Sequence, residues 1–191
     1  MKKFEGAEAE VRIGEEDVKK ERHAKKYRHE KIDEELRHDR TETEQKLMED
    51  ARRHGVNVPE AEKEESNQLR IEKVEGSQLK EVIADRPESL KELGENIALL
   101  HDTGIIHGDL TTSNAVVNEE PYLIDFGLSY RSQRIEDRAV DIHLLKQVLK
   151  SSHPEVAEEA WKEFVEGYRE YEKSEEVLEQ LEDVESRGRY K

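Results

Sequence analysis

The chain has 191 residues, of which 42% are charged and only 33% are hydrophobic, and its formal net charge is −16. This charge disfavours free-standing, non-specific binding to nucleic acid, because polyanions are repelled. The absence of cysteine excludes disulfides, thiolate zinc sites and thiol redox chemistry. Residues 1–20 lack the apolar core of a signal peptide, and no apolar run approaches the ~18 residues that cross a bilayer. We therefore expect a cytoplasmic protein with no membrane contact.

The first part of the chain is predicted to contain a β-hairpin. Apolar residues alternate with charged ones from Ala9 to Ile13, Gly14 interrupts the run, and Val18 begins a second one. A period of two is typical of half-buried strands, and a glycine between two such runs indicates a turn. We therefore expect two paired strands on either side of Gly14.

A long helix is predicted over residues 32–53, where apolar residues recur at helical spacing. Its buried face is expected to consist of Ile32, Leu36, Leu47, Met48 and Ala51. Residues 56–59 (VNVP) and 69–76 (LRIEKVEG) are expected to form a second pair of strands. The acidic segment 59–68 is expected to be the loop between them.

From about residue 85 the pattern changes to helices. Residues 88–102 carry leucine and isoleucine at helical spacing, and residues 115–125 (AVVNEEPYLID) indicate a short hairpin. Three more helices are expected over residues 136–150, 154–171 and 175–185. The predicted fold class is α+β, with a β-rich lobe that contains one long helix and a small helical lobe. The expected divisions are residues 1–75, residues 76–186 and a basic tail at residues 187–191.

Two short motifs indicate phosphotransfer chemistry. The stretch HGDLTTSN contains Asp109 and Asn114 at the spacing D-x-x-x-x-N, and Asp125 opens a D-F-G sequence a little further on. Mg²⁺ prefers a few oxygen ligands and keeps its waters, so the side chains of Asn114 and Asp125 suit it. Asp109 can then orient the attacking oxygen. Asp and Asn are also common in turns, but both motifs at this spacing, with apolar strands between them, are hard to obtain by chance.

A nucleotide site of this kind also needs a lysine on a strand, and two lysines compete for the role. Because side chains of a strand alternate between its two faces, Lys20 shares a face with Val18 while Lys19 points the other way. An apolar residue two positions before the lysine would line a base pocket. This favours Lys20 and leaves Lys19 as a solvated residue.

The lysine in turn needs an acidic partner on the long helix. Glu44 is the only glutamate of that helix on the apolar stripe of Leu47, Met48 and Ala51. An acid on an inward face is unfavourable unless it is paired, and Lys20 is the natural partner. The alternative is a surface pair between Arg40 and Glu44 at i,i+4 spacing.

Taken together, these residues resemble the small atypical kinase subunit of the KEOPS complex, a member of the RIO-like kinase group. The resemblance covers nearly the whole chain in order, through GAEA at 6–9, KER…KKYRH at 20–29, HGDLTTSN, IDFGLS at 124–129, EDRAVDIHLL at 136–145 and the terminal RGRYK. It implies a reduced, bilobal fold like that of protein kinases. A phosphate-covering loop usually has three glycines, and this stretch has only Gly6. It indicates such a loop only because it precedes the strand that carries Lys20.

The resemblance also implies site residues and cofactors. Lys20 would contact the α- and β-phosphates of ATP and pair with Glu44, Asp109 would be the catalytic aspartate, and Asn114 and Asp125 would bind Mg²⁺. The other ATP contacts would come from Gly6, Ala7, Glu8, Ala9, Val11, Val18, Ile71, Glu72 and Val74, with the segment Ile71–Val74 as the hinge that meets adenine.

The resemblance further implies a structural role for Asp141 and a set of partner molecules. Asp141 would brace the catalytic loop. The family is known as an ATPase and weak serine autokinase within a complex that installs the threonylcarbamoyl group on adenosine 37 of tRNA. Expected partners are therefore the threonylcarbamoyl-transferase subunit, a small α/β subunit that contacts the N-terminal lobe, and tRNA within the complex, to which the basic tail would contribute.

Several departures from protein kinases narrow the expected activity. Gly108 replaces the arginine that many protein kinases have before the catalytic aspartate, only fifteen residues separate Asp125 from Asp141, and no Ala-Pro-Glu follows. We therefore rank ATP hydrolysis above general protein kinase activity. Two alternatives stay open: a pseudokinase scaffold, and a small-molecule phosphotransferase of the aminoglycoside or choline type.

Overall fold

The N-terminal part of the chain is built around an antiparallel sheet. In the computed structural model, which describes residues 2–6 and 8–188, five strands pair in the order β1-β2-β3-β5-β4. They are β1 (Lys2–Glu5), β2 (Ala9–Ile13), β3 (Asp17–Arg22), β4 (Ala61–Glu65) and β5 (Gln68–Glu72). The predicted hairpin around Gly14 is confirmed as β2 and β3, with Val11 opposite Lys20. The strand β1 was not predicted.

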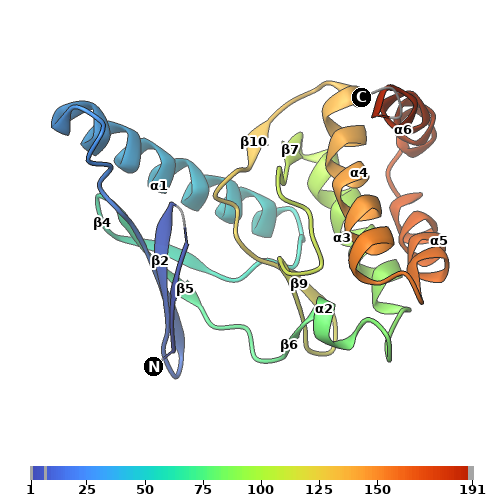
Figure 1. Cartoon of the computed structure of the whole chain (residues 1–191), viewed down its shortest axis with the longest axis horizontal. Coiled ribbons are helices and arrows are strands. Elements are labelled where there is room, and N and C mark those ends of the chain that lie inside the picture. Colours follow the sequence, from blue (N-terminus) through green and yellow to red (C-terminus); the bar gives the residue numbers. More distant parts are fainter. Residues whose placement is uncertain (1, 7, 189–191) are drawn as a thin grey trace.

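Helix α1 (Glu30–Arg53) lies along this sheet and confirms the predicted long helix (Figure 1). Its buried residues include Leu47, Met48 and Ala51, as expected. The prediction was wrong for Ile32 and Leu36, whose exposed fractions are 55% and 38%. The first turns of α1 project past the sheet, which agrees with the exposure of these two residues (Figure 1).

Of the second predicted pair of strands, the one at residues 69–76 is confirmed as β5, although it ends earlier, and the other was predicted at the wrong residues. Residues 56–59 form no strand, and the segment 59–68 that was expected to be a loop contains β4. β4 is an exposed edge strand of charged residues, which pairs with β5 through its backbone and shows no apolar alternation. Val56 and Val58 are apolar because they are buried in the core after the end of α1.

The C-terminal part is mostly helical and lies beside the sheet (Figure 1). Its elements are β6 (Ser77–Gln78), α2 (Leu79–Val82), α3 (Ser89–Asp102), β7 (Ile105–Ile106), β8 (Ala115–Val117), β9 (Pro121–Leu123), β10 (Tyr130–Arg131), α4 (Ile135–Ser152), α5 (Ala157–Tyr168) and α6 (Ser174–Gly188). The predicted hairpin is confirmed as β8 and β9, and the four predicted helices as α3 to α6. The α+β fold class is likewise confirmed.

Two glycines let α3 and α5 approach closely enough to form the core of the helical part. A Cβ atom on Gly94 of α3 would lie 2.2 Å from the carbonyl oxygen of Phe164. A Cβ atom on Gly167 of α5 would lie 1.9 Å from the carbonyl oxygen of Lys91. Any side chain at these positions would push the helices apart. The tight crossing fixes α3, which leads through β7 into the motif HGDLTTSN.

The predicted basic tail falls partly inside a helix. Arg187 belongs to α6, and its guanidinium lies 3.0 Å from the carboxylate of Glu136 at the start of α4. Arg189 and Lys191, the other charges of the predicted tail, lie outside the described residues. Among the described residues, no helix is long and apolar enough to cross a membrane.

Candidate active site

The strand β3 and the helix α1 bring together the predicted lysine and its acid. Lys20 Nζ lies 2.6 Å from Glu44 Oε1, and both side chains are buried. Lys19, on the other face of the strand, pairs with Glu64 at the surface. Arg40 contacts Glu8 and not Glu44, so the alternative surface pair on α1 does not form. The expected inward ion pair is therefore present, on the face that strand alternation selected.

Asp125 reaches the same cluster from the segment after β9. Its Oδ1 lies 2.7 Å from Lys20 Nζ and accepts a hydrogen bond from the Gly127 backbone N–H at 3.2 Å. Burial alone would raise the pKa of Asp125, but the Lys20 ammonium outweighs it and holds this pKa below its ordinary value. Conversely, burial lowers the pKa of Lys20, and Glu44 and Asp125 together bring it above its ordinary value. Both groups are therefore charged at neutral pH.

Asp125 also has an unusual backbone conformation. Its φ of 62° lies in the left-handed region, and no other described non-glycine residue has a positive φ. Asp and Asn enter this region more readily than other residues with side chains, at a cost of about 1–2 kcal/mol. The strained backbone directs the carboxylate of Asp125, half of whose side-chain surface is exposed, next to Lys20.

Asp109 and Asn114 hold each other in the loop between β7 and β8. Asn114 Nδ2 donates to the backbone oxygen of Asp109 at 2.9 Å and to its Oδ2 at 2.8 Å. The backbone N–H of Ile124 donates to the backbone oxygen of Asn114 at 3.0 Å, so this loop lies beside the residue that precedes Asp125. Because the amide nitrogen of Asn114 is used by Asp109, its side-chain oxygen is the atom left for a metal.

Asp141 of α4 fixes the conformation of this loop from below. Its Oδ2 accepts the His107 backbone N–H at 2.8 Å, and its Oδ1 accepts that of Gly108 at 2.9 Å. Gly108 has a φ of 80°, and a Cβ atom there would lie 2.3 Å from the carbonyl oxygen of Leu128. The close approach explains why glycine and not arginine precedes Asp109. His101, which sequence reasoning did not single out, is fully buried and contacts Asp141 Oδ2 through Nε2 at 3.2 Å.

Replacing Asp141 by asparagine is expected to lower the free energy of unfolding by about 2–4 kcal/mol, measured by urea denaturation. An amide has only one oxygen, so its NH₂ group would face a backbone N–H of the loop. The hydrogen bonds that Asp141 accepts outweigh its burial and lower its pKa. The stability that the ionised carboxylate contributes is therefore present above the unfolded pKa of about 3.9, and it is lost as pH falls through the folded pKa. The exposed Asp85 provides the control substitution, and a loss below about 0.5 kcal/mol in Asp141→Asn would contradict the bracing role.

The remaining predicted nucleotide contacts lie on β2, β3 and β5 and in the turns beside them. Gly6 N–H donates to the Ala9 carbonyl at 2.9 Å across the turn between β1 and β2. Ala7 lies outside the described residues, and Glu8 is engaged by Arg40. Val11 and Val18 are half-buried, and Val18 pairs with Ile71 across the sheet.

Two backbone N–H groups of the predicted hinge already donate hydrogen bonds within the protein. The N–H of Glu72 donates to the carbonyl of Glu60 at 2.8 Å, and that of Lys73 donates to the carbonyl of Glu16 at 3.2 Å. Within the described part of the chain, the N–H of Val74 has no such partner. Of these three predicted hinge residues, Val74 is thus the one whose backbone N–H is not used in these contacts.

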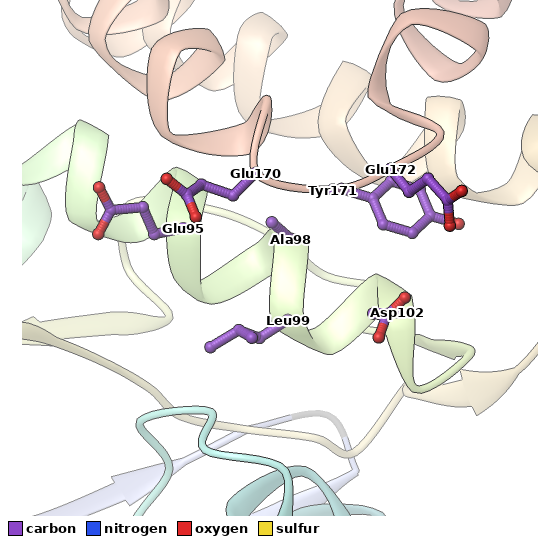
Figure 2. A pocket seen from close by; sticks show the side chains of 7 residues that line it. All are labelled: Glu95, Ala98, Leu99, Asp102, Glu170, Tyr171 and Glu172. Carbon is purple, nitrogen blue, oxygen red and sulfur yellow. The ribbon is translucent and has the colours of Figure 1, made fainter.

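A separate hollow lies between α3 and the turn after α5. It is lined by Glu95, Ala98, Leu99, Asp102, Glu170, Tyr171 and Glu172 (Figure 2). Its volume is about 410 Å³. Four of its seven residues are acidic, which disfavours the binding of a nucleoside triphosphate there. The hollow shares no residue with the cluster around Lys20.

Comparison with known proteins points to one family. A family model described as the RIO domain matches residues 1–160. The KEOPS complex subunit Bud32 of Pyrococcus abyssi is 40% identical over 185 residues, covering 91% of this chain and 84% of that protein. A probable serine/threonine-protein kinase BUD32 homolog of Archaeoglobus fulgidus is 40% identical over 195 residues, covering 100% of this chain and 96% of that protein.

The chain belongs to the RIO domain family. Among solved structures, the Rio2 kinase–ADP/Mg²⁺–phosphoaspartate complex of Chaetomium thermophilum has a TM-score of 0.64 at 15% identity, covering 100% of this chain and 71% of that one. This match confirms the kinase-like fold. A probable bifunctional tRNA threonylcarbamoyladenosine biosynthesis protein of Methanosarcina barkeri is 41% identical over 194 residues, which cover 97% of this chain but only 35% of that protein. The chain thus spans about a third of the length of such relatives.

In the cluster around Lys20, sequence reasoning missed Arg22. Arg22 Nη2 lies 2.5 Å from Glu44 Oε2, and the arginine side chain is 5% exposed. The signal was available, because Arg22 stands two residues after Lys20 on the same strand and so faces the same side.

Proposed function

We propose that this RIO domain binds Mg²⁺-ATP between its sheet and its helical part and acts as an ATPase and atypical serine kinase. The observation that carries the proposal is the meeting of Lys20, Glu44 and Asp125, which come from three separate elements, beside the linked pair Asp109 and Asn114. A buried lysine held between two carboxylates is suited to phosphate binding. A loop aspartate held by an asparagine is suited to positioning an attacking hydroxyl or water.

The side chains present fit a magnesium ion that is also held by phosphates. Asp125 offers a half-exposed carboxylate, and Asn114 offers an amide oxygen. Among the described residues, no group of three or more His, Cys, Asp or Glu side chains could hold a metal alone. Mg²⁺ often binds to one or two protein oxygens together with substrate phosphates and water, so this small donor set is sufficient. When bound, the ion would neutralise charge on the phosphates.

Asp109→Asn is expected to lower ATP turnover by on the order of 10²-fold or more while nucleotide affinity stays within about threefold. The substitution removes the proton acceptor near the attacking oxygen and leaves the residues proposed for the phosphates and metal in place. Turnover is followed by phosphate release, and affinity by calorimetry with ADP.

Asp102→Asn, an exposed position on α3, serves as the matched control for this variant. Loss of ADP binding in Asp109→Asn would contradict the assignment, because it would make Asp109 part of the binding site itself.

We further propose that the chain works in the cytoplasm as the kinase-like part of a KEOPS assembly, which supports formation of threonylcarbamoyladenosine in tRNA. The names of the Pyrococcus and Methanosarcina relatives support this proposal. Its partners would be the threonylcarbamoyl-transferase subunit, a small α/β subunit on the N-terminal sheet and α1, and tRNA. Arg189 and Lys191 would add positive charge near tRNA phosphates in an otherwise acidic chain.

The fate of the γ-phosphate tests the proposed activity. The chain would be given ATP labelled in the γ-phosphate, with and without the transferase partner and tRNA, and label would be followed into free phosphate, its own serines, and added choline or aminoglycoside. We expect most label in free phosphate, a smaller part on serine, and stimulation by the partner and tRNA. Transfer mainly to a small molecule would establish the phosphotransferase alternative, and no turnover under any condition would establish the scaffold alternative.

A further inference from the structure

Glu44 has two cationic partners from the same strand. Lys20 Nζ contacts Oε1 at 2.6 Å and Arg22 Nη2 contacts Oε2 at 2.5 Å, so each oxygen of the carboxylate has its own donor. The side chains of Glu44, Arg22 and Lys20 are 1%, 5% and 9% exposed, respectively. A buried carboxylate that loses one of its partners is strongly destabilised, because water cannot replace the missing donor.

The two cations have different second contacts. Lys20 Nζ is shared with Asp125 Oδ1 at 2.7 Å, whereas Arg22 has no recorded carboxylate contact other than Glu44 in the described part of the chain. Both cations lie beside Gly127, where a Cβ atom would be 3.0 Å from Lys20 Nζ and 3.6 Å from Arg22 Nη2. Lys20 is therefore the cation placed between the two carboxylates, and Arg22 is bound to one.

Nucleotide binding would change the contacts of Lys20 but not those of Arg22. Phosphates compete for the lysine ammonium, and a metal competes for the Asp125 carboxylate that now contacts it. With Lys20 as its only partner, Glu44 would lose charge compensation whenever the lysine moved towards the phosphates. The contact between Arg22 and the opposite oxygen involves neither Lys20 nor Asp125, so this exchange would not break it.

We propose that Arg22 is a positioning residue that holds Glu44, and with it α1, against β3 whether or not Lys20 is engaged by nucleotide. The consequence for ATP rests on the proposed function, since Lys20 then meets the phosphates from a fixed helix. The position of α1 itself does not rest on it. In protein kinases the corresponding lysine–glutamate pair forms or breaks as the helix moves, and here a second pair keeps the helix inward.

Apolar side chains hold the C-terminal half of α1 in the core, but two other ion pairs between α1 and the rest of the chain are more exposed than Arg22–Glu44. Arg40 contacts Glu8 with side-chain exposures of 44% and 48%, and Arg131 contacts Asp50 with exposures of 56% and 27%. Exposed ion pairs contribute at most about 1 kcal/mol and weaken with salt. Of these ion pairs, the buried pair of Arg22 and Glu44 is therefore the one best suited to hold the middle of α1 against β3.

The absence of cysteine allows the position of α1 to be measured directly. Thr43→Cys on the exposed face of α1 and Val140→Cys on the exposed face of α4 would carry a pair of spin labels, and their distance distribution would be recorded with and without Mg²⁺-ADP. The labelled background would be combined with Arg22→Gln, Arg22→Lys, Lys20→Met and the control Arg12→Gln. Arg12 is a half-exposed arginine on the neighbouring strand and pairs with Glu10 and Glu21.

We expect one narrow distribution in the unsubstituted chain, in Arg12→Gln and in Lys20→Met, because Arg22 still holds Glu44 in each. Arg22→Gln should give a broad distribution, and Arg22→Lys should restore most of the narrow one because it keeps the charge. In ATP turnover, Arg22→Gln should raise KM on the order of tenfold with kcat within about threefold, and Arg22→Lys should recover most of the KM.

A narrow distribution and unchanged KM in folded Arg22→Gln would overturn the proposal. If Arg22→Gln does not fold, the Lys20→Met variant decides, because release of α1 there would show that Lys20 and not Arg22 holds the helix. Absence of ATP turnover in the unsubstituted chain would count against the proposed function, while the distance measurements would still test the role of Arg22.

Discussion

Replacing Asp125 by alanine is expected to lower magnesium-dependent ATP turnover by on the order of 10²-fold or more while the fold persists. The carboxylate is preorganised by its backbone and by Lys20, and loss of such a charge at the reacting phosphates removes several kcal/mol of transition-state stabilisation. Lys20 keeps Glu44 as a partner, so no isolated buried charge is created. Phosphate release under saturating ATP measures the effect.

A second substitution separates charge from backbone strain at Asp125. Alanine tolerates the φ of 62° poorly, whereas asparagine enters the left-handed region almost as readily as aspartate. Asp125→Asn should therefore avoid the strain of alanine, unfold only a few degrees below the unsubstituted chain because it loses the ion pair with Lys20, and still lose most turnover. Asp85→Ala provides an exposed control. Turnover of Asp125→Asn within a few-fold of the unsubstituted chain would remove Asp125 from the site.

Lys20→Ala and Lys19→Ala are expected to differ sharply although they are neighbours. The first removes the cation that Glu44 and Asp125 share, so ADP affinity should fall on the order of tenfold or more, together with turnover. The second removes a partly exposed pair with Glu64, worth at most about 1 kcal/mol of stability. Calorimetry with Mg²⁺-ADP compares the two, and circular dichroism confirms that both are folded.

The comparison of the two lysines tests the strand register itself. A shift of one residue in β3 would exchange the faces of Lys19 and Lys20. Equal effects on ADP affinity, or a larger effect from Lys19→Ala, would contradict the register of β3 and with it the placement of every residue in the cluster.

The parts of the fold that sequence predicted well are those where apolar spacing decides the structure. Helices α3 to α6 and the hairpin of β8 and β9 bury one face each, so their periodicity identifies them. β4 escaped because its pairing with β5 uses backbone hydrogen bonds and its side chains are nearly all exposed and charged. Ile32 and Leu36 were misplaced because spacing along a helix does not reveal where the sheet beneath it ends.

The site was predictable to the extent that strand and helix geometry fixes side-chain direction. Alternation selected Lys20 over Lys19, and the apolar stripe of α1 selected Glu44. Arg22 was missed because the sequence argument paired Glu44 with a single cation, although the same alternation places Arg22 on the face of Lys20. The bridge from Lys20 to Asp125 could not be predicted from spacing, since it depends on how the segment after β9 packs against β3.

Magnesium-dependent nucleotide binding tests the central claim most directly. ADP would be titrated into the chain by calorimetry in the presence of Mg²⁺ and again in the presence of EDTA, with Asp125→Asn and Asn114→Ala as variants. The account predicts binding that is at least on the order of tenfold tighter with Mg²⁺, and loss of that difference in both variants, because the metal is proposed to connect these two residues to the phosphates. No detectable ADP binding, or binding of equal strength with and without Mg²⁺, would contradict it.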